Sequence, residues 1–364
     1  MSEVNGTQFR LRDVLEADAA SLVNLARANL RVEWTEDFVY WKYFRNPSGK
    51  AFGCCAELDG KLVGFYANMP VRIKVGDRVV AGAQAVDAMV ALAVRRQGLF
   101  SKLGSRSSAG AAQEGVRLSY AVANPISRAG AVKRLAFADV GEVPRFVRVL
   151  DPGGVVRIAG LMGARALAYR LALRIAQLVS GPLKPASEIR VSRVSSIDGR
   201  FDVLWRAVAT EFPVAVVRDS DYLTWRYVDN PLVQYTILIA ERGGDLLGYA
   251  ILSHRDLEQG IVAIAELIVS PGDRFAGVAL LAKAVARAEE LGAAQMQCWM
   301  LPRYTFYTEL LRTSGFIFSD GALVPRLFGY TSSLIAKSVD GHRLSPDPLQ
   351  LRNWYLTMGD QDYY

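Results

Sequence analysis

Two short segments of the chain combine arginine and glycine where an apolar run changes to a helix-like pattern. The first reads VALAVRRQGLFS from Val90 to Ser101, and the second reads VSPGDRFAGVAL from Val269 to Leu280. A strand that enters a helix through a glycine-containing loop leaves backbone N–H groups unpaired at the positive end of the helix. Such groups can hold a pyrophosphate, and an arginine beside them adds a charge-assisted contact. Both segments therefore predict phosphate-binding loops.

The first loop supplies the fuller set of candidate ligand-binding residues. These are Arg95, Arg96, Gln97, Gly98 and Ser101. The second loop supplies Arg274 and Gly277, with Phe275 beside the arginine. We therefore expect the first copy to be catalytic and the second to be degenerate or to act as a scaffold.

One acidic residue precedes each loop inside an otherwise apolar predicted strand. Asp87 lies in AVDAMVAL, and Glu266 takes the equivalent place in IVAIAELIV. Burial in such a strand raises the pKa of a carboxyl group toward the range of a general base. Asp87 is thus a candidate base and Glu266 its counterpart. The structural alternative is a carboxylate held by backbone donors or by an arginine at a domain interface.

The two loops belong to an internal repeat. The segments DFVYWKYFRNP at 37–47 and DYLTWRYVDNP at 221–231 share five residues at an offset of 184. The strand acids and the loops that follow them repeat at an offset of 179. Constant offsets over about a hundred residues indicate a duplication, and they predict two units with the same fold.

The pattern of each copy predicts a mixed α/β sheet with helices on both faces. Strands and amphipathic helices alternate along it, and the WxYxxNP segment predicts a short helix stopped by its proline. The predicted domains are an N-terminal domain at 1–152, a linker helix at 153–187, a C-terminal domain at 188–334 and a tail at 335–364. We expect the tail to be an appendage of the C-terminal domain.

The chain resembles tandem GNAT-superfamily N-acyltransferases. The two arginine-to-glycine loops carry this resemblance, together with NPISRAGAVKRLAF after the next strand. In the first copy the resemblance implies a further cofactor-binding residue, Asn124, near the CoA arm. It implies two GNAT-like domains, acetyl-CoA as co-substrate, no metal, and transfer of the acetyl group to an amine. The WxYxxNP segment and the W…GDxD ending resemble GNAT proteins associated with bacterial exopolysaccharide biosynthesis. That likeness implies an amine on a sugar or polysaccharide intermediate as the acceptor.

Two parts of the family pattern are less well matched. The tyrosine that usually protonates the leaving thiolate is replaced by Val132 in the first copy and by Leu311 in the second. Other candidate acids are nearby tyrosines, each equally compatible with ordinary packing: Tyr120, Tyr304 and Tyr307. Trp41 and Tyr43 are candidates for the acceptor pocket, with core packing as the alternative for the tryptophan.

The composition bounds the remaining possibilities. The chain has 364 residues, of which 51% are hydrophobic and 22% charged, as expected for a folded protein. Three cysteines do not make a disulfide framework, and the N-terminal segment is unlike a signal peptide, so we expect a cytoplasmic protein. The two histidines lie near no cysteine or carboxylate cluster, which argues against a zinc site.

Two other classes of function stay open. One is a FemABX-like transferase that uses aminoacyl-tRNA, although we expect no nucleic-acid partner because no basic stripe is evident. The other is a non-catalytic tandem module that binds a nucleotide effector or a partner. The net charge of +7 suits a polyanionic ligand or an anionic membrane. The predicted linker helix carries Arg165, Arg170 and Arg174, and it either packs across the units or lies on a membrane surface.

Overall fold

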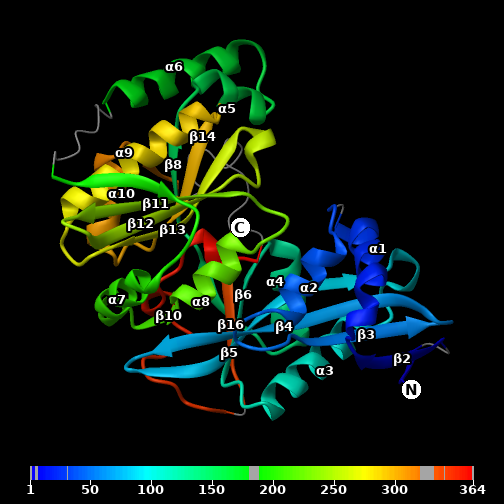
Figure 1. Ribbon diagram of the computed structural model, residues 1–364. Coiled ribbons are helices and arrows are strands. Elements are labelled where there is room, and N and C mark those ends of the chain that lie inside the picture. The colour runs from blue at the N-terminus through cyan, green and yellow to red at the C-terminus, as the bar shows by residue number, and fades with distance from the viewer. Residues whose placement is uncertain are drawn as a thin grey trace.

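The chain folds into two α/β units, each built on one mixed sheet. The computed structural model describes residues 2–4, 7–30, 32–179, 188–319, 332–339 and 341–362. In Figure 1 the first sheet occupies the lower half of the molecule and the second sheet the upper half.

The first unit alternates strands and helices as the repeat predicts. Its elements are β1 (Ser2–Val4), β2 (Thr7–Asp13), α1 (Ala19–Leu30), α2 (Glu36–Phe44), β3 (Phe52–Leu58), β4 (Lys61–Val75), β5 (Arg78–Val90), α3 (Leu99–Gln113), β6 (Leu118–Ala123), α4 (Pro125–Arg134) and β7 (Ala138–Glu142). The strand order is β1-β2-β3-β4-β5-β6-β16-β7, with β5 and β6 parallel. α1 packs on one face of this sheet, and α3 and α4 pack on the other.

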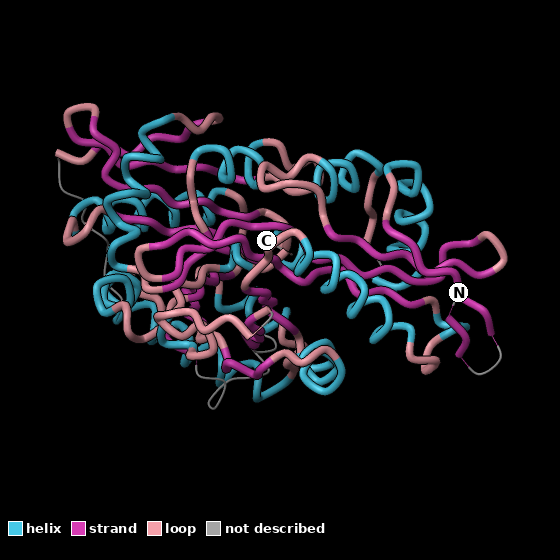
Figure 2. Tube along the Cα trace, turned by 90° about the horizontal axis from the view of Figure 1, so that it is seen from below, coloured by secondary structure: helices cyan, strands magenta, loops and turns pink. Residues whose placement is uncertain are grey.

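The second unit has the same succession of elements, except that it lacks a counterpart of β1 and has the additional strand β10. They are β9 (Arg190–Val194), α7 (Gly199–Val208), β10 (Val214–Val216), α8 (Ser220–Leu223), β11 (Tyr235–Arg242), β12 (Asp245–Ser253), β13 (Ile261–Val269), α9 (Arg274–Glu290), β14 (Gln295–Trp299), α10 (Thr305–Thr313) and β15 (Ile317–Ser319). The strand order is β9-β11-β12-β13-β14-β8-β15, with β13 and β14 parallel. Figure 2, turned by 90°, shows helices along both sides of the long strands.

The two units exchange strands. β10 of the second unit pairs antiparallel with the end of β4 in the first sheet. β8 (Arg145–Val149) follows the first unit in the chain but lies between β14 and β15 of the second sheet. β16 (Ser333–Ser338) follows the second unit but lies between β6 and β7 of the first sheet. In Figure 1 the orange-red β16 stands beside strands of the first unit. The expected boundary at residue 152 and the expected attachment of the tail to the second unit alone therefore miss this exchange.

The segment between the units forms two helices instead of one. α5 (Pro152–Ile158) begins at Asp151, whose carboxylate accepts hydrogen bonds from the backbone N–H groups of Gly153 and Gly154. α6 (Gly163–Val179) follows after a turn, and Leu173 on it is buried in a small cluster with β8. Residues 180–187, the last part of the predicted linker helix, lie outside the described residues.

A shared core holds the two units together. Trp41 of α2 and Trp225 stack with ring centroids 4.9 Å apart. The indole N–H of Trp41 donates to the carbonyl of Trp225 at 2.7 Å, and Trp225 returns the bond at 3.0 Å. These are equivalent residues of the repeat, so the contact lies where the two copies meet with matching faces.

Candidate functional site

A cavity opens in the first sheet where β5 and β6 part. The two strands pair only from Gly82 to Gln84. A bulge between β4 and β5 then redirects β5, and Asp87 sits in it with a φ of 52°. The next residues of both strands line a cavity of about 160 Å³. Strands that part in this way leave backbone edges to which an extended ligand can bind.

Side chains from several elements complete the walls of this cavity, which we call the β5–β6 slot. They are Leu30, Tyr66, Phe100, Asn124, Ser127, Ala131, Ile335, Gln361 and Asp362. Asn124 is also the N-cap of α4, where its side-chain oxygen accepts hydrogen bonds from the N–H groups of Ile126 and Ser127. The structure thus brings Asp87 and Asn124, far apart in the sequence, to one cavity.

The predicted phosphate loop leads from the end of β5 into α3. Gly98 is the N-cap of α3 with a φ of 74°, and within the described residues no side chain caps this end of the helix. Arg95 and Arg96 are exposed beside it, and Gln97 and Ser101 are half-buried. The guanidinium of Arg95 donates to Asn29 at 3.1 Å. The open helix end and the two cations make this loop electropositive.

Asp87 belongs to a buried cluster of charged groups at the inner end of the slot. Its Oδ2 lies 2.6 Å from the ammonium of Lys42 and accepts a hydrogen bond of 2.6 Å from the hydroxyl of Tyr43. The same ammonium donates to Asp362 at 3.1 Å. The Lys42 and Asp87 side chains are almost fully buried, whereas that of Asp362 is 17% exposed.

The surroundings shift the pKa values of this cluster. Burial raises the pKa of Asp87, outweighing the ammonium of Lys42, which lowers it. Burial lowers the pKa of Lys42, but the carboxylates of Asp87 and Asp362 outweigh burial and raise it. Two carboxylates face one ammonium, so the ionised cluster carries a net negative charge. Such a site attracts the ammonium form of an amine.

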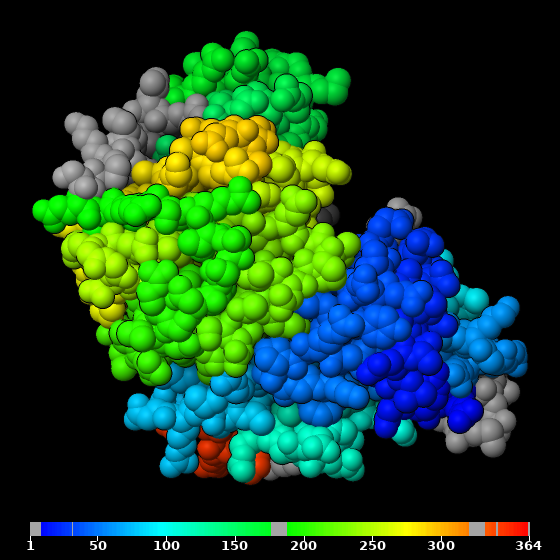
Figure 3. All heavy atoms as spheres, viewed as in Figure 1, coloured from blue at the N-terminus to red at the C-terminus, as the bar shows by residue number. Residues whose placement is uncertain are grey.

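Two further hollows lie next to the Asp87 cluster. A small one of about 20 Å³ is lined by Lys42, Asp87 and Asp362 together with Val32 and Arg255. An open groove of about 1320 Å³ adjoins it, because Val32 and Arg255 line both. Figure 3 shows the surface hollowed between the blue segment around α1 and the yellow-green second unit. The groove between the units thus leads to Asp87 through the small hollow.

Glu266, the counterpart of Asp87, is locked into the core of the second unit. Its Oε2 accepts a hydrogen bond of 2.8 Å from Arg218, and its Oε1 accepts one of 2.8 Å from Tyr227. Arg218 also donates to Asp360 at 2.6 Å, and all three charged side chains are at most 1% exposed. Glu266 therefore has the environment of a structural ion pair.

The slot of the second unit is filled by the C-terminal segment. The hydroxyl of Tyr355 donates to the carbonyl of Leu267 on β13 at 2.5 Å. The hydroxyl of Tyr307 accepts a hydrogen bond from the N–H of Val269 at 3.2 Å. Gly359 packs so closely that an added Cβ would lie 2.7 Å from a carboxylate oxygen of Glu266. The backbone edge that is free in the first unit is covered here.

The second loop also differs from the first. The side chain of Asp273 caps α9 by accepting from the N–H of Ala276 at 3.0 Å, which puts a negative charge where a phosphate would bind. Gly277 lies inside α9, where an added Cβ would come within 2.5 Å of Leu310. The close packing of α10 against α9 therefore explains why a glycine stands at this position. Arg274 is exposed, 3.9 Å from Glu309.

The aromatic candidates have mostly structural positions. Trp41 is buried against Trp225, whereas Tyr43 contacts Asp87. Tyr120 is buried against Trp354, and burial keeps its pKa well above the usual range. Tyr304 packs on Phe212 and Tyr355, and Tyr307 is bonded to β13 in the second unit. These three tyrosines thus lie in cores, away from the β5–β6 slot.

Three residues of the site were missed at the level of sequence. Lys42 and Arg226 occupy equivalent positions of the repeat. Two cations at equivalent positions of an otherwise aromatic segment could have indicated a functional position. Tyr66 lines the slot, but its alternating strand pattern resembles any core position. Asp362 lies in the tail, which has no counterpart within the repeat.

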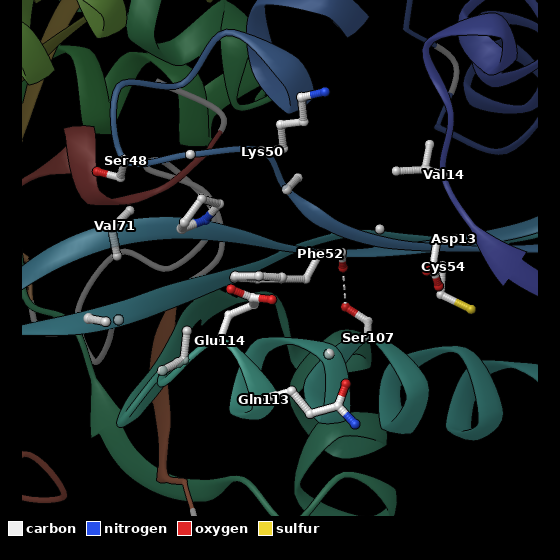
Figure 4. A pocket seen from close by; sticks show the side chains of 18 of the residues that line it. Asp13, Val14, Ser48, Lys50, Phe52, Cys54, Val71, Ser107, Gln113 and Glu114 are labelled. Atoms are coloured by element: carbon white, nitrogen blue, oxygen red, sulfur yellow. Dashed lines mark hydrogen bonds between the residues drawn. The ribbon is translucent and has the colours of Figure 1, made fainter.

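A larger cavity of about 560 Å³ lies at the other end of α3 (Figure 4). Asp13, Lys50 and Glu114 line it, and the hydroxyl of Ser107 donates to the carbonyl of Phe52 at 2.5 Å. It contains none of the predicted cofactor-binding residues. Its position at the start of β5 separates it from Asp87, near the end of that strand.

Comparison with known proteins finds a family match in the first unit. Residues 10–135 match the family described as Acetyltransferase (GNAT) domain. A sequence comparison with curated proteins gives no match.

Solved structures similar to the chain share its fold at low sequence identity. A probable N-acyltransferase from Enterococcus faecalis is 13% identical with a TM-score of 0.63, covering 92% of this chain and 73% of its own. A GCN5-related N-acetyltransferase from Anabaena variabilis is 12% identical with a TM-score of 0.62, covering 91% and 73%. The N-myristoyltransferase of Saccharomyces cerevisiae, solved with myristoyl-CoA and inhibitors, is 12% identical with a TM-score of 0.58, covering 91% and 80%.

Residues 10–135, within the first unit, thus match the GNAT acetyltransferase family, and the chain as a whole shares its fold with solved N-acyltransferases. The predicted fold class of two GNAT-like mixed sheets is confirmed. Among the described residues, no helix has both the length and the apolar character needed to cross a membrane. Within the same residues, no group of His, Cys, Asp and Glu side chains is arranged to hold a metal ion.

Proposed function

We propose that the first unit binds acetyl-CoA and transfers its acetyl group to an amine on a sugar or polysaccharide intermediate, while the second unit acts as a scaffold. The observation that carries this proposal is the contrast between the two slots. The slot between β5 and β6 is open and lined by Asp87 and Asn124. The equivalent edge of β13 is covered by Tyr355 and Tyr307.

The first loop suits the pyrophosphate of the cofactor. α3 begins at Gly98 without a side-chain cap among the described residues, and Arg95 and Arg96 lie next to it. The N–H groups of the first helical turn can donate to phosphate oxygens, and the arginines neutralise their charge. The pantetheine arm would then run along the free edge of β5 toward Asp87, with Asn124 at its side.

The Asp87 cluster suits the chemistry of an amine acceptor. An ammonium group drawn to the negative cluster must lose a proton before it attacks the thioester, and Asp87 is placed to accept that proton directly or through water. The neutral nitrogen then bonds to the carbonyl carbon, and the C–S bond breaks to release the CoA thiolate. The thiolate takes a proton, for which Tyr66 is the tyrosine of the slot; burial raises its pKa, so it stays protonated.

The groove between the units suits a hydrophilic acceptor larger than a simple amine. It has a volume of about 1320 Å³. Charged and polar side chains line much of it, including Glu33, Arg193, His254, Asp256 and Glu258. A sugar presents many hydroxyl groups, and side chains of both charges can donate to them and accept from them.

Calorimetric titration with acetyl-CoA, followed by turnover assays on amino sugars, tests the proposal. We expect micromolar binding at one site per chain and release of CoA when an amino sugar is added. Binding that persists in Arg95→Ala/Arg96→Ala but is lost in Arg274→Ala would move the site to the second unit. Binding without turnover on any amine would favour the non-catalytic alternative.

A further inference from the structure

α6 presents an exposed apolar face. Leu167 is 70% exposed, Leu171 is 59% exposed and Ile175 is 54% exposed. These residues are four apart, so they lie along one side of the helix. Leu173, on the opposite side, is buried against the second unit and fixes which face points outward. An exposed row of large aliphatic side chains is unfavourable in water and indicates a contact surface.

Arginines border this apolar face. Between residues 152 and 179 the chain has four arginines and not one aspartate or glutamate. At about 100° per residue, Arg170 and Arg174 flank the apolar row on one side, whereas Arg165, near the start of the helix, lies almost opposite Leu167. All three are exposed. The face is therefore apolar along its middle and cationic along one margin.

The position of α6 leaves this face accessible. α6 stands at the outer end of the second unit, away from the first unit (Figure 1), and with α5 it forms a projection on the surface in Figure 3. With 17 residues it is shorter than a helix that spans a bilayer, but it is long enough to lie flat in one.

We propose that α6 docks the protein on the surface of an anionic lipid bilayer. The row formed by Leu167, Leu171 and Ile175 inserts among the acyl chains, and the flanking arginines contact lipid phosphates. Charge complementarity selects this occupant, because a bilayer with anionic headgroups offers an apolar layer beneath a negative one. Neither protein partners nor a second copy of this cationic helix match both features as well.

The helix pair α5 and α6 also adjoins one edge of the groove between the units. Ile158 at the end of α5 lies 3.1 Å from the position of an added Cβ on Gly260. The preceding residues, Leu257 and Gln259, line the groove. A sugar acceptor attached to a lipid could therefore reach the groove from the bilayer, a consequence that rests on the proposed function. The docking itself does not depend on catalysis.

Flotation of the full chain with lipid vesicles tests the proposal. Vesicles of phosphatidylcholine with phosphatidylglycerol are compared with vesicles of phosphatidylcholine alone. We expect binding to the anionic vesicles that weakens as salt is raised. The double variant Leu167→Ser/Leu171→Ser should bind at least about tenfold more weakly, because it removes the inserted side chains. The triple variant Arg165→Gln/Arg170→Gln/Arg174→Gln should lose the preference for anionic vesicles.

A matched control separates this face from exposed apolar residues in general. Val79 is 58% exposed and Val203 is 60% exposed, and both lie far from α6 in the chain. The variant Val79→Ser/Val203→Ser should bind vesicles like the wild type. Absence of vesicle binding, or equal loss in the control variant, would overturn the proposal. So would a dimer in solution that the Leu167→Ser/Leu171→Ser change dissociates, because the occupant would then be a second copy.

Discussion

Gly98 and Gly115 stand at opposite ends of α3 in the same left-handed backbone conformation. Their φ angles are 74° and 81°. In the part of the chain that the structure describes, no heavy atom lies within 4 Å of a Cβ added to either glycine. They differ in what surrounds them, since only Gly98 adjoins the arginine loop. Substitutions at these two glycines therefore distinguish the effect of backbone strain from the effect of blocking a ligand.

Replacing Gly98 by valine should abolish binding of acetyl-CoA, whereas replacing Gly115 should not. Both changes force a branched residue into a left-handed conformation, which lowers the free energy of unfolding by about 1–2 kcal/mol. Only the Gly98→Val side chain would occupy the space that a phosphate needs. Thermal melting measures the common strain, and calorimetric titration measures binding. Equal affinity in the two variants would refute the assignment of this loop.

The change Asp87→Asn should lower turnover by about 10²–10⁴-fold, as expected for loss of a general base. The dissociation constant for acetyl-CoA should change little, because no phosphate contact is removed. The reduction in turnover should become smaller at high pH, where the amine is already neutral. Steady-state kinetics across pH, with binding measured in parallel, checks this. A loss that is constant with pH would indicate a structural role for Asp87.

The change Glu266→Gln should reduce stability and leave turnover per folded molecule near the wild-type value. It removes a charge from a buried pair with Arg218, and breaking such a pair costs roughly 3 kcal/mol. Chemical denaturation measures the stability, and assays at low temperature measure turnover. An inactive but stable Glu266→Gln variant would place the active centre in the second unit.

The pH dependence of catalysis should respond in opposite directions to changes at Lys42 and Asp362. The base works when deprotonated, so kcat/KM should rise with pH through the raised pKa of Asp87. Lys42 lowers that pKa and Asp362 raises it. The acidic limb should therefore move to higher pH in Lys42→Met and to lower pH in Asp362→Asn. If the acidic limb of kcat/KM moved in the same direction in both variants, a group other than Asp87 would control it.

The stacked pair of Trp41 and Trp225 should couple the stabilities of the two units. Each single change to alanine should cost about 3–5 kcal/mol. A double-mutant cycle should show a coupling of roughly 0.5–1.5 kcal/mol. The wild type should unfold in one calorimetric transition, because the core is continuous across the units. Two separate transitions would contradict this interpretation.

The repeat allowed much of the fold and part of the candidate site to be predicted. Constant offsets identify equivalent strands, so Asp87 and Glu266 lie at equivalent places, each in or beside a bulge of its sheet. The sequence pattern alone could not show that the two carboxylates lie in different environments. That difference arises from the tail, which reaches Glu266 through Thr357 and reaches Lys42 through Asp362. Such contacts join residues far apart in sequence, and local periodicity carries no information about them.

The strand exchange was equally invisible to local patterns. β8 and β16 each consist of five or six residues, and short apolar strands look alike whichever sheet they join. The break between α5 and α6 was also missed, although Gly160 and Gly163 lie between the helices with positive φ angles. Glycines that end one helix and start another are a usable signal.

The exchange of β8 and β16 also constrains how the protein can be made. A ribosome releases residues of the first unit long before Ser333–Ser338, so β6 and β7 emerge without the strand that separates them in the finished sheet. Until then the nascent chain exposes two unpaired strand edges, which are sites of aggregation. The first unit therefore cannot complete its sheet during synthesis. We expect a gene fragment that ends at residue 152 to yield aggregated protein, while the whole chain folds only after translation is nearly finished.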